Sequence, residues 1–132
     1  MKGSYILLIS VRKDSAIRIG KLGSISFPKG FYCYVGSAMN SLENRVNRHY
    51  SKEKKLRWHI DYLLSSPHVF IRNVLAFPSE NRMECDISQL VKEKADRVVR
   101  KFGSSDCRCE GHLYYFRDEN AEKVIANLHL SK

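Results

Sequence analysis

The first third of the chain has strand-like patterns of hydrophobic and polar positions. Residues 5–11 are almost wholly apolar and rich in β-branched side chains, which predicts a strand covered on both faces. Residues 16–27 alternate loosely around Gly20 and Gly23 and predict a β-hairpin. Residues 31–35 predict another strand, aromatic in character, after a turn.

Helix-like spacing becomes common in the rest of the chain. Asn40 or Ser41 can cap a helix whose apolar face begins at Leu42. The other predicted elements are helices over 56–64, 85–101 and 120–130 and strands over 70–77 and 113–116, with Gly103 as the stop after 85–101. This order predicts an α/β (α+β) fold in which a small central sheet, mixed or antiparallel, is flanked by helices.

Size and charge narrow the class of protein. With 132 residues, positions 1–132 are expected to form one domain. The chain has 23 Lys and Arg against 14 Asp and Glu, a net charge of +9, so polyanions are the expected partners, with DNA first and RNA as the alternative. No apolar run approaches the roughly 20 residues of a membrane-spanning helix, and the start lacks the layout of a signal peptide. We therefore expect a cytoplasmic protein with no membrane partner.

Two tyrosine tripeptides lie at the ends of the strands predicted over residues 5–11 and 31–35. They are Gly-Ser-Tyr at residues 3–5 and Tyr-Val-Gly at residues 34–36, and antiparallel pairing would bring both phenols to the same end of the sheet. In the helix that follows, Leu42, Arg45 and His49 recur about one turn apart. A phenol, a guanidinium and an imidazole beside a sheet are groups that a phosphodiester-cleaving site needs. This order of residues resembles the GIY-YIG nuclease superfamily.

The resemblance implies a GIY-YIG-like fold and a role for each of these side chains. Tyr5 or Tyr34 would orient or activate the attacking water, and Arg45 would stabilise charge on the phosphoryl oxygens. A phenol has a reference pKa of about 10, so it acts as a base at neutral pH only where nearby cations lower that pKa. His49 is a further candidate catalytic residue. A Mg²⁺ or Mn²⁺ held by a carboxylate would assist the leaving oxygen.

The chain departs from the superfamily's pattern in two places. Residues 11–30 form a long insert between the tripeptides, which an extra hairpin must accommodate. The superfamily's metal-binding glutamate stands in a Glu-x-x-x-x-Glu-like segment, and here Gln89 takes that ligand position if Glu84 aligns with the first glutamate. A neutral amide is a weaker ligand for a hard divalent cation than a carboxylate. Glu84 and Asp61 are therefore the candidate metal ligands.

Three segments resemble a narrower protein family within this relationship: residues 30–38, 57–64 and 103–113. These segments look like an uncharacterised, largely archaeal family that is distantly related to the GIY-YIG nucleases and sometimes fused to DNA-repair glycosylases. The resemblance spans nearly the whole chain and implies a connection with DNA repair.

Other polar residues gather near these segments. His59 has two open interpretations, a hydrogen-bonded structural role beside a packed Trp58 or proton transfer and phosphate contact. A basic run between the first two predicted helices would suit a solvated loop, but its place after Arg45 favours a surface that contacts phosphates without reading bases. The candidate nucleic-acid-binding residues are Arg48, Lys52, Lys54, Lys55 and Arg57.

The cysteines are expected to be thiols or metal ligands rather than disulfides, because no secretory signal is present. Cys107, Cys109 and His112 would form a zinc site if Cys85 or Cys33 were the fourth ligand. The Cys-x-Cys-x-x-His spacing lacks the usual Cys-x-x-Cys knuckle, so packing is favoured over zinc or reactive thiols. Zinc is therefore not expected, and His112 is kept as a further candidate for the proposed site.

The leading hypothesis from the sequence is a metal-dependent endonuclease that cleaves DNA phosphodiester bonds. The alternatives are a non-catalytic nucleic-acid-binding module on the same scaffold and a protein-interaction domain that uses exposed aromatic side chains. Metal-dependent nicking would support the first hypothesis, and salt-sensitive binding without cleavage would support the second.

Overall fold

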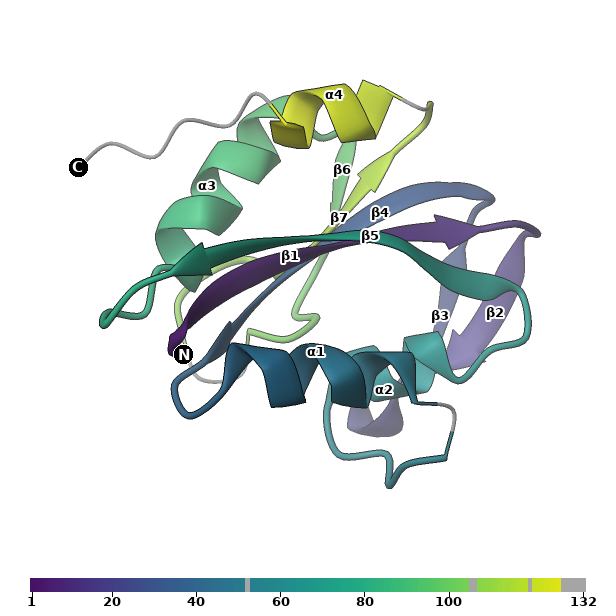
Figure 1. Ribbon diagram of the computed structural model, residues 1–132. Coiled ribbons are helices and arrows are strands. Elements are labelled where there is room, and N and C mark those ends of the chain that lie inside the picture. Colours follow the sequence, from purple (N-terminus) through teal and green to yellow (C-terminus); the bar gives the residue numbers. More distant parts are fainter. Residues whose placement is uncertain (52, 105–106, 119, 127–132) are drawn as a thin grey trace.

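The computed structural model describes residues 1–51, 53–104, 107–118 and 120–126, and its fold is α+β as predicted (Figure 1). Its elements are, in chain order, β1 (Gly3–Val11), β2 (Ser15–Arg18), the 3₁₀ turn η1 (Gly20–Leu22), β3 (Ser24–Phe27), β4 (Gly30–Ala38), α1 (Leu42–Tyr50), α2 (His59–Leu64), β5 (Val69–Pro78), α3 (Glu84–Lys94), β6 (Arg97–Val99), β7 (Leu113–Phe116) and α4 (Asn120–Ala126).

Five strands form one antiparallel sheet in the order β5-β1-β4-β7-β6. β1 is an interior strand, and its alternate side chains enter two separate cores. Leu7 and Ile9 pack on the side of α2, whereas Ile6 and Leu8 pack on the side of α3 and α4. In Figure 1, α1 and α2 lie below the sheet and α3 and α4 lie above it. The prediction of a doubly covered strand is therefore confirmed.

The insert between the two tyrosine tripeptides folds as the predicted hairpin. β2 and β3 pair with each other as a second, two-stranded sheet. Ile19 and Phe27 are fully buried in the core on the α2 side. The insert therefore extends this core and leaves the pairing of β1 with β4 intact.

The helix predicted over residues 85–101 is wrong in its length, because α3 already ends at Lys94. Val91 is the last buried apolar residue of α3, and Ala95 already has extended backbone angles. The β-branched Val98 and Val99 then pair with β7 as strand β6. Val98 fits the helical period of Ile87 and Val91 only by coincidence. Gly103 is therefore no helix stop but lies in the loop before β7, with φ of +70°.

The helices predicted over residues 56–64 and 120–130 correspond to α2 and α4. α2 begins at His59 rather than at residue 56, because the Asp61 carboxylate accepts the backbone N–H groups of Arg57 and Trp58 and holds that segment extended. α4 is described as far as Ala126, so the predicted continuation to residue 130 lies outside the described residues. Within the described ranges, no helix has the length and apolar character needed to cross a bilayer.

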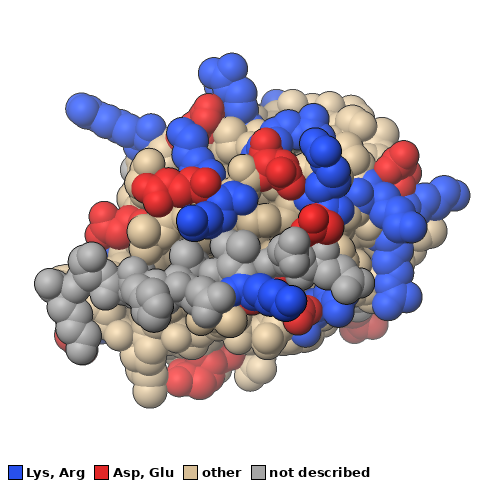
Figure 2. Space-filling model, turned by 90° about the horizontal axis from the view of Figure 1, so that it is seen from above, with Lys and Arg blue, Asp and Glu red and all other residues tan. Residues whose placement is uncertain are grey.

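Charges on the face above α3 and α4 are mixed. In Figure 2, lysine and arginine side chains on this face are interspersed with aspartate and glutamate, without one continuous basic field among the visible described atoms. The overall positive charge is therefore no guide by itself to where a polyanion would bind, and the local charge of each cavity is the more useful quantity.

Candidate active site

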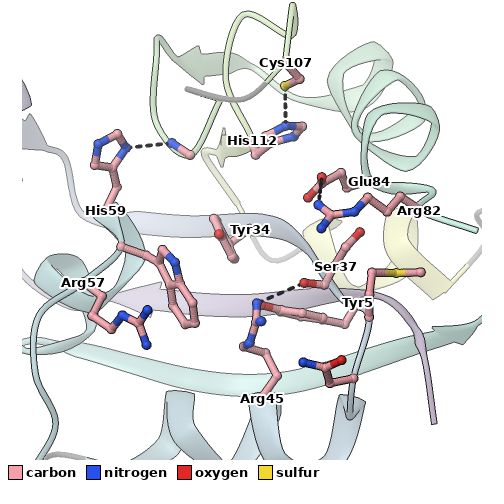
Figure 3. A pocket seen from close by; sticks show the side chains of 14 residues that line it. Tyr5, Tyr34, Ser37, Arg45, Arg57, His59, Arg82, Glu84, Cys107 and His112 are labelled. Carbon is pink, nitrogen blue, oxygen red and sulfur yellow. Dashed lines mark hydrogen bonds and ion pairs between the residues drawn. The ribbon is translucent and has the colours of Figure 1, made fainter.

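A cavity of about 340 Å³ lies at the end of β4 that β7 does not cover. β7 pairs only with residues 31–34 of β4, and Ser37 further along the strand belongs to the cavity wall. Side chains from β1, β4, α1, the start of α3 and the loop before β7 point into it (Figure 3). The residues most important for its chemistry are Tyr5, Tyr34, Arg45, Arg57, Arg82 and Glu84.

The tyrosines of the two tripeptides meet at this cavity. Tyr5 lies opposite Gly36 and Tyr34 lies opposite Leu7, which brings the two rings to 6.4 Å between centroids. A Cβ at position 36 would lie only 2.5 Å from Tyr5 Oη. Gly36 is therefore needed for the Tyr5 phenol to cross over β4.

The Tyr5 phenol ends against the last turn of α1. Its Oη lies 2.7 Å from His49 Nε2, and both side chains are buried. Burial raises the pKa of Tyr5 to about 12 although the Arg45 charge opposes it. Burial also raises the pKa of Tyr34, and burial followed by the Lys54 charge lowers the pKa of His49 to about 3. At neutral pH both phenols and the imidazole are therefore neutral, and a Tyr5 proton donated to Nε2 leaves the phenol oxygen as an acceptor.

Arg45 is held at the cavity by two contacts. Its Nη1 donates to the Ser37 carbonyl at 3.0 Å, and its guanidinium carbon lies 4.3 Å from the centroid of the Trp58 ring. Cation–π stacking and a backbone acceptor both restrict a side chain that is otherwise flexible. The guanidinium is thus positioned beside the tyrosines before any ligand arrives (Figure 3).

Glu84 supplies a carboxylate to the same cavity. It is the first residue of α3 and forms an ion pair with Arg82 at 3.6 Å. The Met83 N–H donates to Ser4 Oγ, which ties this end of α3 to β1 next to Tyr5. Gln89 lies about 140° around the helix from Glu84 and is exposed. The carboxylate at position 84, and not the amide at position 89, therefore faces the cavity.

Asp61, the other candidate metal ligand, forms hydrogen bonds within the protein interior. Its carboxylate is fully buried and accepts hydrogen bonds from Arg48 Nη1 and Nη2 and from the N–H groups of Arg57 and Trp58. Burial would raise its pKa, but these hydrogen bonds outweigh burial and hold the pKa below its usual range. Asp61 does not line the cavity, so its geometry is that of a structural anchor.

The candidate phosphate-contacting residues separate into different environments. Arg57 lines the cavity, whereas Arg48 donates to Asp61 and to the Lys55 carbonyl. Lys54 Nζ donates to two carbonyls at the end of α1, and Lys55 is exposed. Lys52 lies outside the described residues. Arg82 and Trp58 also line the cavity. Sequence reasoning gave neither of them a role there, because no local pattern shows that Arg82 reaches the cavity or that Trp58 stacks on Arg45.

The two remaining candidate histidines lie on the far wall of the cavity. His59 Nδ1 accepts the Gly103 N–H at 2.9 Å, which places its ring proton on Nε2. Burial lowers the pKa of His59 and of His112, so both rings are neutral at neutral pH. His112 Nε2 lies 3.1 Å from Cys107 Sγ, on the side away from the tyrosines (Figure 3). The structure thus gives His59 a structural partner and associates His112 with the cysteines.

The buried state of His49 predicts a loss of stability in acid. Its folded pKa of about 3 lies below the ordinary value, so protons favour the unfolded chain as the pH falls from about 6.5 towards 3. We expect this residue alone to cost about 2 kcal/mol of unfolding free energy at pH 5 relative to pH 7.5. Urea denaturation of wild type and His49→Gln at both pH values measures the difference. His68→Gln, at an exposed position, is the control, and equal pH slopes for wild type and His49→Gln would contradict the prediction.

Comparisons with known proteins identify a family for the chain. No curated protein and no solved structure matches it. One family model matches residues 4–131, which is nearly the full length, and this agrees with the predicted membership of an uncharacterised family. The chain therefore belongs to the family described as Domain of unknown function DUF123.

Proposed function

We propose that the protein is a metal-dependent endonuclease that hydrolyses DNA phosphodiester bonds, and that its scaffold is related to the GIY-YIG nucleases. One observation carries the proposal: Tyr5, Tyr34, Arg45 and Glu84 come from four separate elements and line one cavity. All four were predicted from the sequence as candidates for phosphodiester chemistry. The register of β1 against β4 brings the two tyrosines together.

The charge of the cavity suits a phosphate group. Arg45, Arg57 and Arg82 line it, and Glu84 is the only acidic residue in its described lining. Guanidinium groups bind phosphate oxygens through paired N–H donors, and they remain charged at every relevant pH. A backbone phosphate placed here would meet Arg45 beside the two phenols. Arg45 would then stabilise the extra negative charge that develops during displacement.

We propose that Tyr5, hydrogen-bonded to His49, orients the attacking water. With the phenol proton donated to His49 Nε2, the Tyr5 oxygen accepts a hydrogen bond from a water in the cavity and orients it. The raised pKa of Tyr5 and the lowered pKa of His49 keep both groups neutral, so the pair orients the water by hydrogen bonding and does not remove its proton. As the water attacks, its proton passes to a phosphate oxygen or to solvent.

The residues present fit one divalent cation. Mg²⁺ is usually held by one or two carboxylates together with substrate phosphates and water, so the single carboxylate of Glu84 is an adequate protein ligand. Asp61 does not fit, because Arg48 and two backbone N–H groups occupy its oxygens. When bound, Mg²⁺ or Mn²⁺ would polarise a phosphoryl oxygen and stabilise the leaving oxygen.

A non-catalytic nucleic-acid-binding module is the second candidate function. The observation in its favour is that both phenols have raised pKa values, so neither is a ready base, while the three arginines would bind phosphate without any reaction. Both candidate functions require binding to a nucleic acid, and only the first requires cleavage.

Binding to DNA is expected to weaken steeply as salt increases. If Arg45, Arg57 and Arg82 each neutralise one phosphate, the slope of log K against log salt is about −2.7 on duplex DNA. Fluorescence anisotropy with labelled duplex and branched DNA between 50 and 200 mM salt measures this slope. Arg57→Ala should reduce the slope by about one. Affinity that does not change over this range would contradict a phosphate-binding cavity.

The experiment that tests the endonuclease is nicking of supercoiled DNA by the purified protein. We expect relaxed circles to form when Mg²⁺ or Mn²⁺ is added and not when both are left out. Omission is preferable to a chelator, because a chelator would also remove any other metal from the protein. Binding to DNA without nicking under every metal condition would favour the binding module.

A further inference from the structure

Three thiols and one imidazole gather beside the cavity, outside the chemistry proposed above. The ligand atoms of Cys85, Cys107, Cys109 and His112 all lie within 4.8 Å of one another. Cys85 belongs to the first turn of α3, and the other three come from the loop before β7. The Cys-x-Cys-x-x-His spacing favoured simple packing because it lacks the usual Cys-x-x-Cys knuckle, and the sequence left open whether Cys85 or Cys33 would be the fourth ligand. We propose that these four residues form a structural zinc centre.

His112 is already oriented as a ligand. Its Nδ1 lies 2.5 Å from Ser88 Oγ of α3, and its Nε2 faces Cys107 Sγ. Its backbone is fixed on both sides, because its N–H donates to the Phe102 carbonyl and its carbonyl accepts from the Val35 N–H. A hydrogen bond from the second ring nitrogen is the usual way in which a metal-bound histidine is held. Ser88 therefore leaves Nε2 as the atom that would meet the ion.

The kind and number of ligands favour zinc. Three sulfurs and one nitrogen make the closed tetrahedral set of structural zinc sites, whereas Mg²⁺ and Ca²⁺ prefer oxygen. Zinc bonds of about 2.3 Å to sulfur and about 2.0–2.1 Å to nitrogen put neighbouring ligand atoms roughly 3.5–3.8 Å apart. Pairs at the present limit of 4.8 Å need to close by only about 1 Å, whereas Cys107 Sγ and His112 Nε2, at 3.1 Å, need to separate slightly. Each thiol releases one proton to solvent on binding, and no redox step is involved.

The position of the centre indicates what it does. Cys107 and His112 line the cavity, and Cys85 directly follows Glu84. Zinc would therefore join the loop before β7 to the start of α3 and hold one wall of the cavity in place. Cys85 is exposed, which gives the ion a route into the site. The proposal does not depend on nuclease activity, since it concerns only the stability of this junction.

Metal analysis of the full chain tests the proposal. Protein purified under reducing conditions is expected to carry about one zinc per chain, and a strong chelator should lower its Tm by roughly 10 °C or more. Cobalt added to the zinc-free protein should produce the visible absorption of tetrahedral thiolate coordination. Folded, reduced protein that holds less than about a tenth of an equivalent of zinc and shows no such cobalt spectrum would overturn the proposal.

Variants locate the ion among the cysteines. Cys109→Ser should lose zinc and the cobalt spectrum, whereas Cys33→Ala should keep both, because Cys33 is buried in the core and is not one of the four grouped residues. A disulfide among Cys85, Cys107 and Cys109 in the native protein, or a stoichiometric metal other than zinc, would also overturn the proposal. If Cys109→Ser does not fold, the zinc content and cobalt spectrum of the wild type still decide the matter.

Discussion

Replacement of Arg45 by alanine is expected to lower the single-turnover rate of DNA cleavage by about 10²–10³-fold, the usual cost of removing one donor that stabilises charge in a transition state. Arg45 is fixed between the Ser37 carbonyl and the Trp58 ring at the edge of the cavity. Truncation therefore removes a positioned charge without opening the core. Arg45→Lys should recover only part of the rate, because an ammonium group cannot reproduce the planar stacking and paired donors.

Arg72→Ala is the matched control for this prediction. Arg72 also stacks its guanidinium on an aromatic ring, that of Phe31, but it lies in β5 and pairs with Glu122 of α4. The substitution removes the same charge on the other side of the sheet. Rates must be measured with enzyme in excess over DNA, since Arg45→Ala should also weaken binding. If Arg45→Ala and Arg72→Ala cut at the rate of the wild type, Arg45 has no part in the chemistry.

Replacement of Asp61 by alanine is expected to lower the unfolding free energy by about 3 kcal/mol, the lower end of the range for a buried ion pair, because the Arg48 side chain that remains is partly exposed. The change leaves the Arg48 guanidinium without its carboxylate and two backbone N–H groups without their acceptor. Urea denaturation at neutral pH measures the loss. Asp86→Ala, at an exposed position on α3, should stay within about 0.5 kcal/mol of the wild type.

The double variant Arg48→Met with Asp61→Leu refines this prediction. Replacing both charges removes the unpaired guanidinium and should recover part of the lost stability. Recovery stays incomplete, because the N–H groups of Arg57 and Trp58 still lack an acceptor. If Asp61→Ala unfolds within about 1 kcal/mol of the wild type, Asp61 is not the anchor inferred from its contacts.

Much of the fold could be predicted from local pattern. The apolar run of β1, the hairpin insert and the Ser41 cap, whose Oγ accepts the Asn44 N–H, all depend on near neighbours in the chain. The meeting of the two tyrosines followed from antiparallel pairing and a side-chain period of two. The early end of α3 could not be predicted, because β6 exists only through its pairing with β7.

The site was less predictable, because its contacts join distant segments. The sequence could not show that the Asp61 carboxylate pairs with Arg48 or that Trp58 stacks on Arg45. Nor could it show that Cys85 lies close to Cys107. Of the two candidate metal ligands predicted from the sequence, Glu84 lines the cavity and Asp61 does not, and the sequence could not distinguish them. Tertiary packing, which no local pattern records, decided each of these cases.

The most direct test of the proposed function is the Mn²⁺-dependent cleavage rate of wild type, Tyr5→Phe and Glu84→Gln on the same supercoiled DNA. Tyr5→Phe removes only the hydroxyl next to His49, and Glu84→Gln removes only the charge of the cavity's carboxylate. We predict cleavage by the wild type and a loss of about 10²-fold or more in each variant, with DNA affinity retained. Absence of metal-dependent cleavage by the wild type, or equal rates for all three proteins, would contradict the account.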